Sequence, residues 1–345
     1  MDPREEHYRI ASPHAGLSLF LRRLATETGH ARPVLYVHGA TFPSALSVAH
    51  RFSDGSWRDA LVQAGFDVWA LDFLGFGGSD RYREMDGPAD ATGPLLLAAD
   101  VVRQLGVAVR FVVERTGSER VSLVAHSWGS AVVGLLAGEC PELIDRLVLF
   151  GPISRREKPR YLPRPDGPAW RVITAQAQWD RFVEDVPADA LPVLSRAEFE
   201  DWAERYLDSD PESRRREPAG VKVPTGPFVE ILRSWHEELP YDPGLVERLG
   251  AVALDLARRE IGDPLADAGE ASSYPGEGPF RRLLRLPFAR RRDCGRYAPA
   301  DGAAGAPVRH DGGRALQVLH DRRDRSASGS RAAEGRGGCA ARDRA

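Results

Sequence analysis

The segment from Val121 to Ser130, VSLVAHSWGS, constrains the possible folds of this chain more than any other. Its first four residues are largely apolar and favour a β-strand, and a helical pattern follows directly after Ser127. The residues two before and two after this serine are Ala125 and Gly129, and such small side chains let backbone pack against backbone in a sharp turn. A strand, a tight turn at a serine and a helix form the layout of a nucleophile elbow, which holds the serine hydroxyl above the edge of a sheet.

Further apolar runs of strand length stand on both sides of this segment. They read as a buried strand at 33–40 that ends in His-Gly, a second strand at 66–73 and a third short apolar run at 146–152. Tyr8–Ala11 and Leu17–Leu21 read as an opening hairpin, with its turn at 13–16.

Helical stretches alternate with these strands. Apolar residues recur at helical spacing from Leu95 to Glu114, where Thr116-Gly117 ends the pattern, and 131–138 is an almost wholly apolar helix. Such alternation predicts an α/β fold with a mostly parallel, doubly wound sheet and right-handed crossovers.

Three short motifs follow successive strands of this pattern. They are His38-Gly39, then Asp72-x-x-Gly75-x-Gly77-x-Ser79, then Ala125-His126-Ser127-Trp128-Gly129. In this order and spacing they make the sequence resemble the α/β-hydrolase family over residues 7–248, with Ala125 where the family usually has glycine. The resemblance implies a helical lid inserted after the sixth strand.

The chain is expected to have four parts: the N-terminal part of an α/β-hydrolase core at 7–153, a helical lid at 154–239, the remainder of the core at 240–271 and an irregular or disordered tail at 272–345. The lid carries charged helical stretches, prolines and aromatic residues that include Trp170, Trp179, Phe182, Phe199, Trp202, Tyr206, Phe228 and Trp235. Most of these should pack the lid onto the core, while one or two line an apolar pocket.

The resemblance implies roles for the residues around the serine. A serine hydroxyl needs a base to become a nucleophile, and its attack on an ester-like carbonyl produces an oxyanion that backbone N–H groups stabilise. Ser127 is the implied nucleophile, and the oxyanion donors are the N–H of Trp128 and that of Ala40 or Thr41. An ordinary buried turn serine is the alternative for Ser127.

Several nearby residues are expected to be structural. The resemblance makes His38 and His126 loop-shaping residues, with the His126 side chain pointing away from the reaction. Gly75, Gly77 and Gly78 lie in neither a Walker-type nor a dinucleotide-binding motif, so they are turn glycines.

The catalytic acid and base are harder to place. In this fold they follow the nucleophile on the late strands. Residues 251–256 could form such a strand; Asp263 is the first candidate for the acid and Asp255 the second, with ordinary surface carboxylates as the alternative. No clear last strand and no Gly-x-His follow, and His310 and His320 lie in sequence rich in Arg, Gly and Asp.

The composition changes at about Ser272, after which Arg, Ala and Gly dominate. One interpretation is a natural disordered or nucleic-acid-binding tail. The other is a shifted reading frame in a GC-rich gene. If the codons are read one nucleotide later, residues 296–299 can encode Gly-Thr-His. In the same frame, 290–294 can encode an apolar run and 314–318 can encode Ala-Leu-Tyr-Arg. The shifted frame would thus supply the missing strand, the histidine after it and a following helix.

Length and composition limit the classes of function. The chain has 345 residues, 42% of them hydrophobic, enough for one large core with an insertion. A formal net charge of −3 indicates no polyanionic partner, and three cysteines, Cys140, Cys294 and Cys339, fit neither a disulfide framework nor a zinc site. The acidic N-terminus lacks the apolar core of a secretion signal, and no apolar run could span a bilayer. We therefore expect a cytoplasmic protein that acts on a small molecule without cofactor or metal and has neither a membrane nor a nucleic-acid partner, its oligomeric state open.

Two main hypotheses of function follow. The first is a serine hydrolase that cleaves an ester, thioester or amide of a small to medium apolar molecule through an acyl-enzyme on Ser127. The alternative is a non-catalytic, hydrolase-like binding protein, or an inactive product that lacks the catalytic histidine. A third class, a nucleic-acid-binding protein that uses the basic tail, would show strongly salt-dependent binding.

Overall fold

The computed structural model describes residues 3–26, 32–52, 55–153, 167–187, 190–234, 240–241 and the backbone of 252–254. A seven-stranded sheet forms its centre, in the order β1-β2-β4-β3-β5-β6-β9. The strands are β1 (Glu6–Ala11), β2 (Ser18–Leu24), β3 (Arg32–Val37), β4 (Phe66–Asp72), β5 (Val121–His126), β6 (Ile144–Phe150) and β9 (Val252–Leu254). The first two pair as the expected antiparallel hairpin, β2 is antiparallel to β4, and all other neighbours are parallel. The predicted mostly parallel sheet is confirmed.

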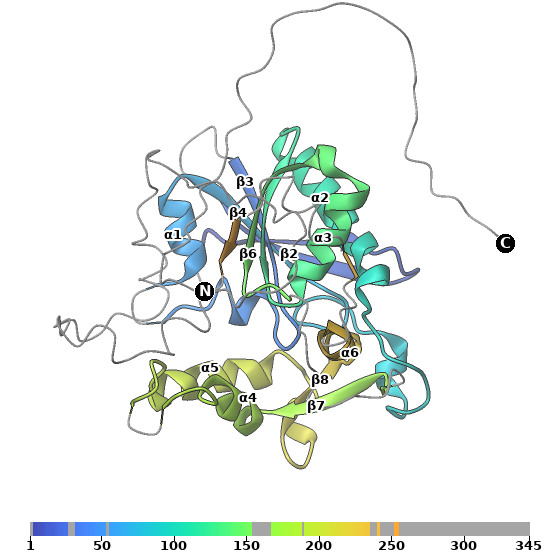
Figure 1. The fold of residues 1–345 in the computed structure, drawn as a ribbon, viewed down its shortest axis with the longest axis vertical. Coiled ribbons are helices and arrows are strands. Elements are labelled where there is room, and N and C mark those ends of the chain that lie inside the picture. The colour runs from blue at the N-terminus through green and yellow to red at the C-terminus, as the bar shows by residue number, and fades with distance from the viewer. Residues whose placement is uncertain are drawn as a thin grey trace, which may run out of the picture.

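Helices cover both faces of the sheet. In Figure 1, α1 (Trp57–Gln63) lies on one side of the strands, and α2 (Ala98–Thr116) and α3 (Gly129–Glu139) lie on the other. The residues of β3 explain this layout, because Leu35 and Val37 pack into the core under α2 and α3, whereas Val34 and Tyr36 pack with Trp57 of α1. A strand that is apolar on both faces needs cover on both, as in doubly wound folds.

The two predicted helices before and after the serine turn are present, with small changes in their bounds. The first, α2, begins at Ala98 and not at 95, because Leu96 has a positive φ of 67° and cannot belong to a helix. It ends at Gly117, whose φ is 65°, as the sequence predicts. The connections in the described ranges also contain the short 3₁₀ helices η1 (Ser44–Leu46), η2 (Arg83–Asp86), η3 (Pro141–Leu143) and η4 (Ser213–Arg215).

Residues 167–234 form a separate layer at the lower end of the sheet in Figure 1. The layer contains β7 (Trp170–Thr174), α4 (Ala175–Phe182), α5 (Arg196–Asp208), η4, β8 (Gly220–Pro224) and α6 (Gly226–Arg233). The segment predicted to be a helical lid thus contains the helices α4, α5 and α6 and, in addition, two strands that the sequence did not predict, since β7 and β8 pair as an antiparallel ribbon. The segments WRVIT and GVKVP are rich in β-branched residues, which favour strands over helices.

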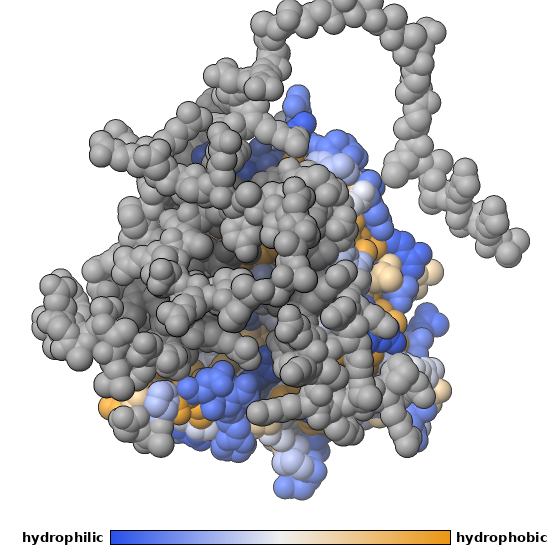
Figure 2. Space-filling model, in the orientation of Figure 1, coloured by the Kyte–Doolittle hydropathy of each residue, from blue (hydrophilic) through white to orange (hydrophobic). Residues whose placement is uncertain are grey.

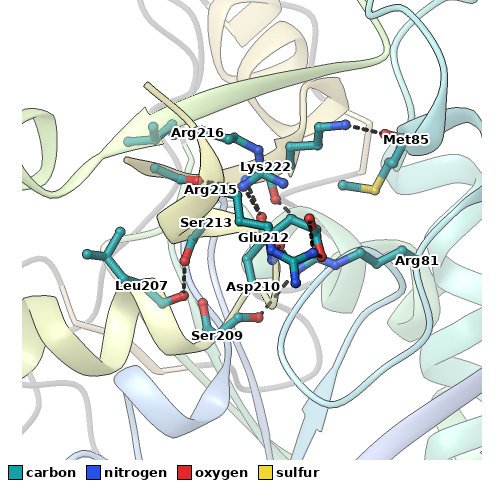
Figure 3. A network of polar contacts seen from close by, with 12 residues as sticks. Arg81, Met85, Leu207, Ser209, Asp210, Glu212, Ser213, Arg215, Arg216 and Lys222 are labelled. Atoms are coloured by element: carbon teal, nitrogen blue, oxygen red, sulfur yellow. Dashed lines mark hydrogen bonds and ion pairs between the residues drawn. The ribbon is translucent and has the colours of Figure 1, made fainter. Parts of the chain in front are cut away.

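A buried carboxylate holds this layer together (Figure 3). Asp210 is 3% exposed and accepts hydrogen bonds from Arg216 Nη1 at 2.6 Å and from the backbone N–H groups of Lys222 and Glu212 at 2.9 and 3.0 Å. Burial alone would raise the pKa of Asp210, but these donors and the nearby Arg81 lower it below its ordinary value. The carboxylate is therefore ionised and joins η4 to β8.

Two long cationic side chains connect the layer to the loop after β4. Arg81 of that loop donates to the carbonyl oxygens of Ser209 at 3.2 Å and Lys222 at 3.3 Å. In return, Lys222 Nζ donates to Met85 O at 2.6 Å, and its ammonium lies 3.9 Å from the centre of a Trp170 ring. These contacts, most of which are drawn in Figure 3, attach the ribbon to the core.

Candidate active site

Ser127 lies at the junction between β5 and α3 with a φ of +52°. It is one of two non-glycine residues with a positive φ in the described part of the chain. Such a conformation costs roughly 1–3 kcal/mol and persists only where the surroundings enforce it. The Ser127 N–H donates to Phe150 O at 2.8 Å, and Ser130 Oγ donates to Ser127 O at 2.6 Å, so the bend is fixed on both sides.

The need for small residues around this bend is visible in the packing. A Cβ atom added to Gly129 would lie 2.6 Å from His38 O and 2.9 Å from Val37 O, closer than van der Waals contact permits. One added to Gly39 would lie 3.2 Å from Ser127 Cβ. The end of β3 therefore packs directly against the start of α3, as the small residues in the sequence predict.

The residues expected to bind an oxyanion lie around this contact. Ala40 and Thr41 are buried in the loop that begins at Gly39 and passes Ser127. Trp128 is completely buried as the N-cap residue of α3, where the first amides of a helix have no acceptor within it. Their roles in stabilising an oxyanion stay predictions.

Both ring nitrogens of His38 are occupied by backbone. Its Nδ1 lies 2.8 Å from Gly39 O, and the Phe73 N–H donates to its Nε2 at 3.1 Å, so the proton belongs on Nδ1. Burial lowers the pKa of His38, although Asp72 nearby opposes the shift. The neutral ring thus joins the loops after β3 and β4 and offers no free nitrogen for proton transfer.

His126 is the other imidazole beside Ser127. Its ring packs on Phe150 with centroids 5.2 Å apart. A Cβ added to Gly39 would be 3.2 Å from His126 Nδ1 and equally far from Ser127 Cβ, so both residues pack against Gly39. Burial, with smaller contributions from Arg181 and His38, lowers the pKa of His126 to about 4. The side chain is neutral at physiological pH.

Asp72 organises the glycine-containing loop after β4. Its Oδ1 accepts from the N–H and hydroxyl of Ser44 at 2.8 and 2.6 Å, and its Oδ2 accepts from Gly78 N–H at 3.1 Å. Gly75 and Gly77 have φ values of +88° and +51°, the left-handed conformation of turn glycines. This loop therefore has a structural role beside the site.

Aromatic residues of the 167–234 layer meet the loop after β3. Phe199, Trp202 and Tyr206 are buried along one face of α5. Phe42, next to Thr41, contacts Trp202 and Phe182 with centroids 5.3 and 6.1 Å apart. Phe182 of α4 is 36% exposed, and hydrophobic surface lies among hydrophilic surface along the lower edge of the molecule, where α4 and α5 lie (Figure 2). Trp235 lies outside the described residues.

Other predicted residues also lie outside them, namely Asp255, Asp263, His310 and His320. Within the described ranges, Ser127 Oγ has no hydrogen bond to an imidazole or a carboxylate, and no group of three or more His, Cys, Asp and Glu side chains could hold a metal ion. The same ranges contain no helix of the length and apolarity needed to cross a membrane.

Sequence reasoning did not single out Glu230. This residue of α6 accepts a hydrogen bond from the Trp128 indole at 2.6 Å. The available signal was an acidic residue among the apolar residues of GPFVEILR. The spacing of apolar residues in an amphipathic helix would place such a charged residue in solvent.

Comparison with known proteins agrees with this geometry. Residues 32–190 match the family model of the alpha/beta hydrolase fold. Lipase member N of Mus musculus is 26% identical over 125 residues, 35% of this chain and 31% of the relative. The lysosomal acid lipase/cholesteryl ester hydrolase of Homo sapiens is 24% identical over 126 residues, 36% of this chain and 32% of the relative. The chain thus spans less than two thirds of either relative.

Solved structures include similar folds. The 2-hydroxy-6-oxo-6-phenylhexa-2,4-dienoate hydrolase of Rhodococcus sp. strain RHA1 is 19% identical, with a TM-score of 0.44 over 73% of this chain and 80% of that one. The sheet order, the serine turn between β5 and α3 and the match over residues 32–190 together show an alpha/beta hydrolase fold.

Proposed function

We propose that this chain is a serine hydrolase that cleaves an ester, thioester or amide of a small to medium apolar molecule through an acyl-enzyme on Ser127. The observation that carries the proposal is the left-handed backbone of Ser127, at φ +52° between β5 and α3 and directly beside Gly39. A strained serine at a strand–helix junction is the geometry that exposes a nucleophile in this fold.

The proposed reaction has two steps. Ser127 Oγ bonds to the carbonyl carbon while a base takes its proton, and the bond to the leaving group then breaks as that proton is returned to it. Water hydrolyses the resulting acyl-enzyme by the same route. The oxyanion formed in each step would accept hydrogen bonds from the N–H of Trp128 and that of Ala40 or Thr41.

The acid and base are proposed to come from the chain after β9. Asp263 is the acid candidate, and the histidine is proposed to be the one that a shifted reading frame encodes at 296–299. The present sequence has no histidine at these positions, so the gene product read in the shifted frame is proposed to be the active form. Among described histidines near the serine, His38 is occupied by backbone and His126 is neutral with a pKa of about 4. Sequencing the gene tests this part, since an intact frame without a hidden Gly-Thr-His contradicts it.

The substrate class is supported by two observations. Phe42 and Phe182 bring apolar surface to the loop that begins beside Ser127. Two relatives are named lipases, one of them also a cholesteryl ester hydrolase, which favours an ester. A serine nucleophile also argues against the branches of this fold that use a carboxylate. A cytoplasmic location stays a prediction, which cell fractionation can test.

Covalent labelling tests the proposal. A fluorophosphonate probe should phosphonylate the wild-type chain with loss of fluoride, and mass spectrometry should place the label on Ser127. The Ser127→Ala variant should not be labelled, whereas Ser122→Ala, on the strand β5 that leads to Ser127, should be labelled at the wild-type rate. A folded wild-type chain without label would favour the alternative, a non-catalytic binding protein.

A further inference from the structure

A buried carboxylate joins the 167–234 layer to the residue that follows the serine. Glu230 of α6 is 7% exposed. Its Oε2 accepts a hydrogen bond from Trp128 Nε1 at 2.6 Å. The backbone N–H of Ala98 lies 3.0 Å from Oε1 and 3.1 Å from Oε2. One side chain of α6 thus contacts the start of α2 and the start of α3, the consecutive helices on either side of β5.

The contact at Ala98 is that of a helix cap. Leu97, the N-cap residue of α2, has no side-chain hydrogen bond to the helix, so its first turn lacks the usual Ser, Thr or Asp cap. The carboxylate of Glu230 takes this place from another element, where the positive end of the helix dipole favours a negative charge. Burial raises the pKa of Glu230, while the donors on Trp128 and Ala98 oppose the shift.

The position of Glu230 is itself fixed by backbone contacts. The N–H of Gly226, the first residue of α6, donates to Leu95 O at 2.8 Å, and a side chain at Gly226 would collide with that carbonyl. The N–H of Thr225 donates to Ala169 O at 3.2 Å. The start of α6 therefore cannot shift without moving the segment that leads into α2.

The other end of the contact is the amide beside Ser127. The Trp128 ring is completely buried, and it meets the Phe73 ring edge to face with centroids 5.9 Å apart. The hydrogen bond from the indole N–H to Glu230 fixes the orientation of this ring. The fixed ring in turn restricts the backbone of Trp128. The Trp128 N–H directly follows Ser127, the residue with the strained backbone.

We propose that Glu230 is a positioning residue, which holds the Trp128 indole so that the Trp128 backbone N–H stays directed at the oxyanion formed on Ser127. This inference rests on the proposed function. Glu230 touches neither substrate nor reacting atoms and acts through Trp128. A displacement of about 1 Å in a catalytic group can cost roughly a hundredfold in rate, so loss of the contact is expected to slow the chemical step and leave substrate binding almost unchanged.

The test compares Glu230→Gln with wild type in two measurements. The rate of Ser127 phosphonylation by the fluorophosphonate, whose phosphoryl oxygen occupies the oxyanion position, should fall roughly ten- to a hundredfold. For an ester that wild type hydrolyses, kcat should fall while KM changes less than twofold. The indole N–H signal of Trp128 in a nitrogen-15 NMR spectrum, assigned from its loss in Trp128→Phe, should move upfield. Glu114→Gln, an exposed carboxylate further along α2, should leave both the rate and the signal unchanged.

A double variant separates positioning from a general loss of structure. If Glu230 acts through the indole, Glu230→Gln should slow labelling little further in the Trp128→Phe background. A moved indole signal with labelling within twofold of wild type would overturn the inference and leave the proposed function intact. Additive losses in the double variant would overturn it too, whereas a wild-type chain without label on Ser127 would overturn the proposed function and this inference together.

Discussion

The Cα of Gly129 faces His38 O so closely that a Cβ atom would lie 2.6 Å from that oxygen. Neither partner can move away cheaply, because the carbonyl belongs to the backbone at the end of β3 and Gly129 is the first residue of α3. The approach holds the loop after β3 against the serine bend and links the stability of the fold to the geometry of the site.

Gly129→Ala should therefore destabilise the protein. Overpacking of this kind costs about 1–3 kcal/mol, and the free energy of unfolding in urea should fall by that amount, together with the labelling rate of Ser127. Gly93→Ala is the matched control, since a Cβ at Gly93 meets nothing within 4 Å. Equal stability of the two variants would contradict the close approach.

His126 should make stability depend on pH below neutrality. Burial lowers its pKa in the folded chain to about 4, against 6.5 for an unperturbed imidazole. Between these pH values the unfolded chain binds more protons than the folded chain. The contribution of His126 to the free energy of unfolding is therefore complete above pH 6.5 and is lost as the pH falls towards 4, by at most about 3 kcal/mol. The His126 ring signals should show no titration in NMR between pH 7 and 5. In His126→Asn, the decrease in unfolding free energy over this range should be smaller; an unchanged decrease would assign the effect to other groups.

Asp210→Asn should loosen the 167–234 layer. Removal of one partner of a buried ion pair costs about 3–5 kcal/mol at neutral pH, because the remaining charges lose compensation. The pKa of Asp210 lies below its ordinary value, so its stabilisation is present above about pH 4 and is lost as the pH falls further. Denaturation curves should show a lower unfolding free energy at pH 7 and a shallower loss in acid. Asp208→Asn, at an exposed ion pair with Arg214, should change little.

Phe182→Ala should change the preference for acyl chain length. Phe182 contacts Phe42, the residue after Thr41, and under the proposed function both would line the acyl pocket. An apolar pocket gains about 1–3 kcal/mol from each well-packed methylene group. With 4-nitrophenyl esters, kcat/KM for octanoate should fall about tenfold, while kcat/KM for acetate changes less than twofold. Leu191→Ala, at an exposed apolar residue of the same layer, is the control. An equal loss of kcat/KM for both esters would show that Phe182 does not contact the acyl chain.

The strands and the serine bend were predictable because they depend on local patterns. Val34 to Val37 are apolar on both faces, and only a sheet covered on both sides satisfies that pattern. Ala125 and Gly129 bracket a serine at a spacing that a tight strand–helix turn requires. Both patterns involve only residues that are close together in the sequence, so they can be recognised without knowledge of tertiary contacts.

The parts that were not predicted depend on contacts between distant segments. The pairing of β7 with β8 brings together residues about fifty positions apart. The segment that contains both strands is rich in charged residues and prolines, so no strand periodicity stands out in its sequence. The start of α2 depends on Leu96, whose positive φ no local rule anticipates. Glu230 is buried because Ala98 and Trp128 both donate to it, and its own neighbours in sequence carry no sign of either.

The double attachment of the 167–234 layer has a consequence for protein engineering. Arg81 and Lys222 fasten one side of it, and Glu230 fastens the other beneath the helix that begins at Ala98. In a chimera that takes this layer from a homologue, Arg81 and the backbone N–H of Ala98 would face residues of the other protein in place of their present acceptors. Transplantation therefore requires the donor's loop between β4 and α2 to travel with it.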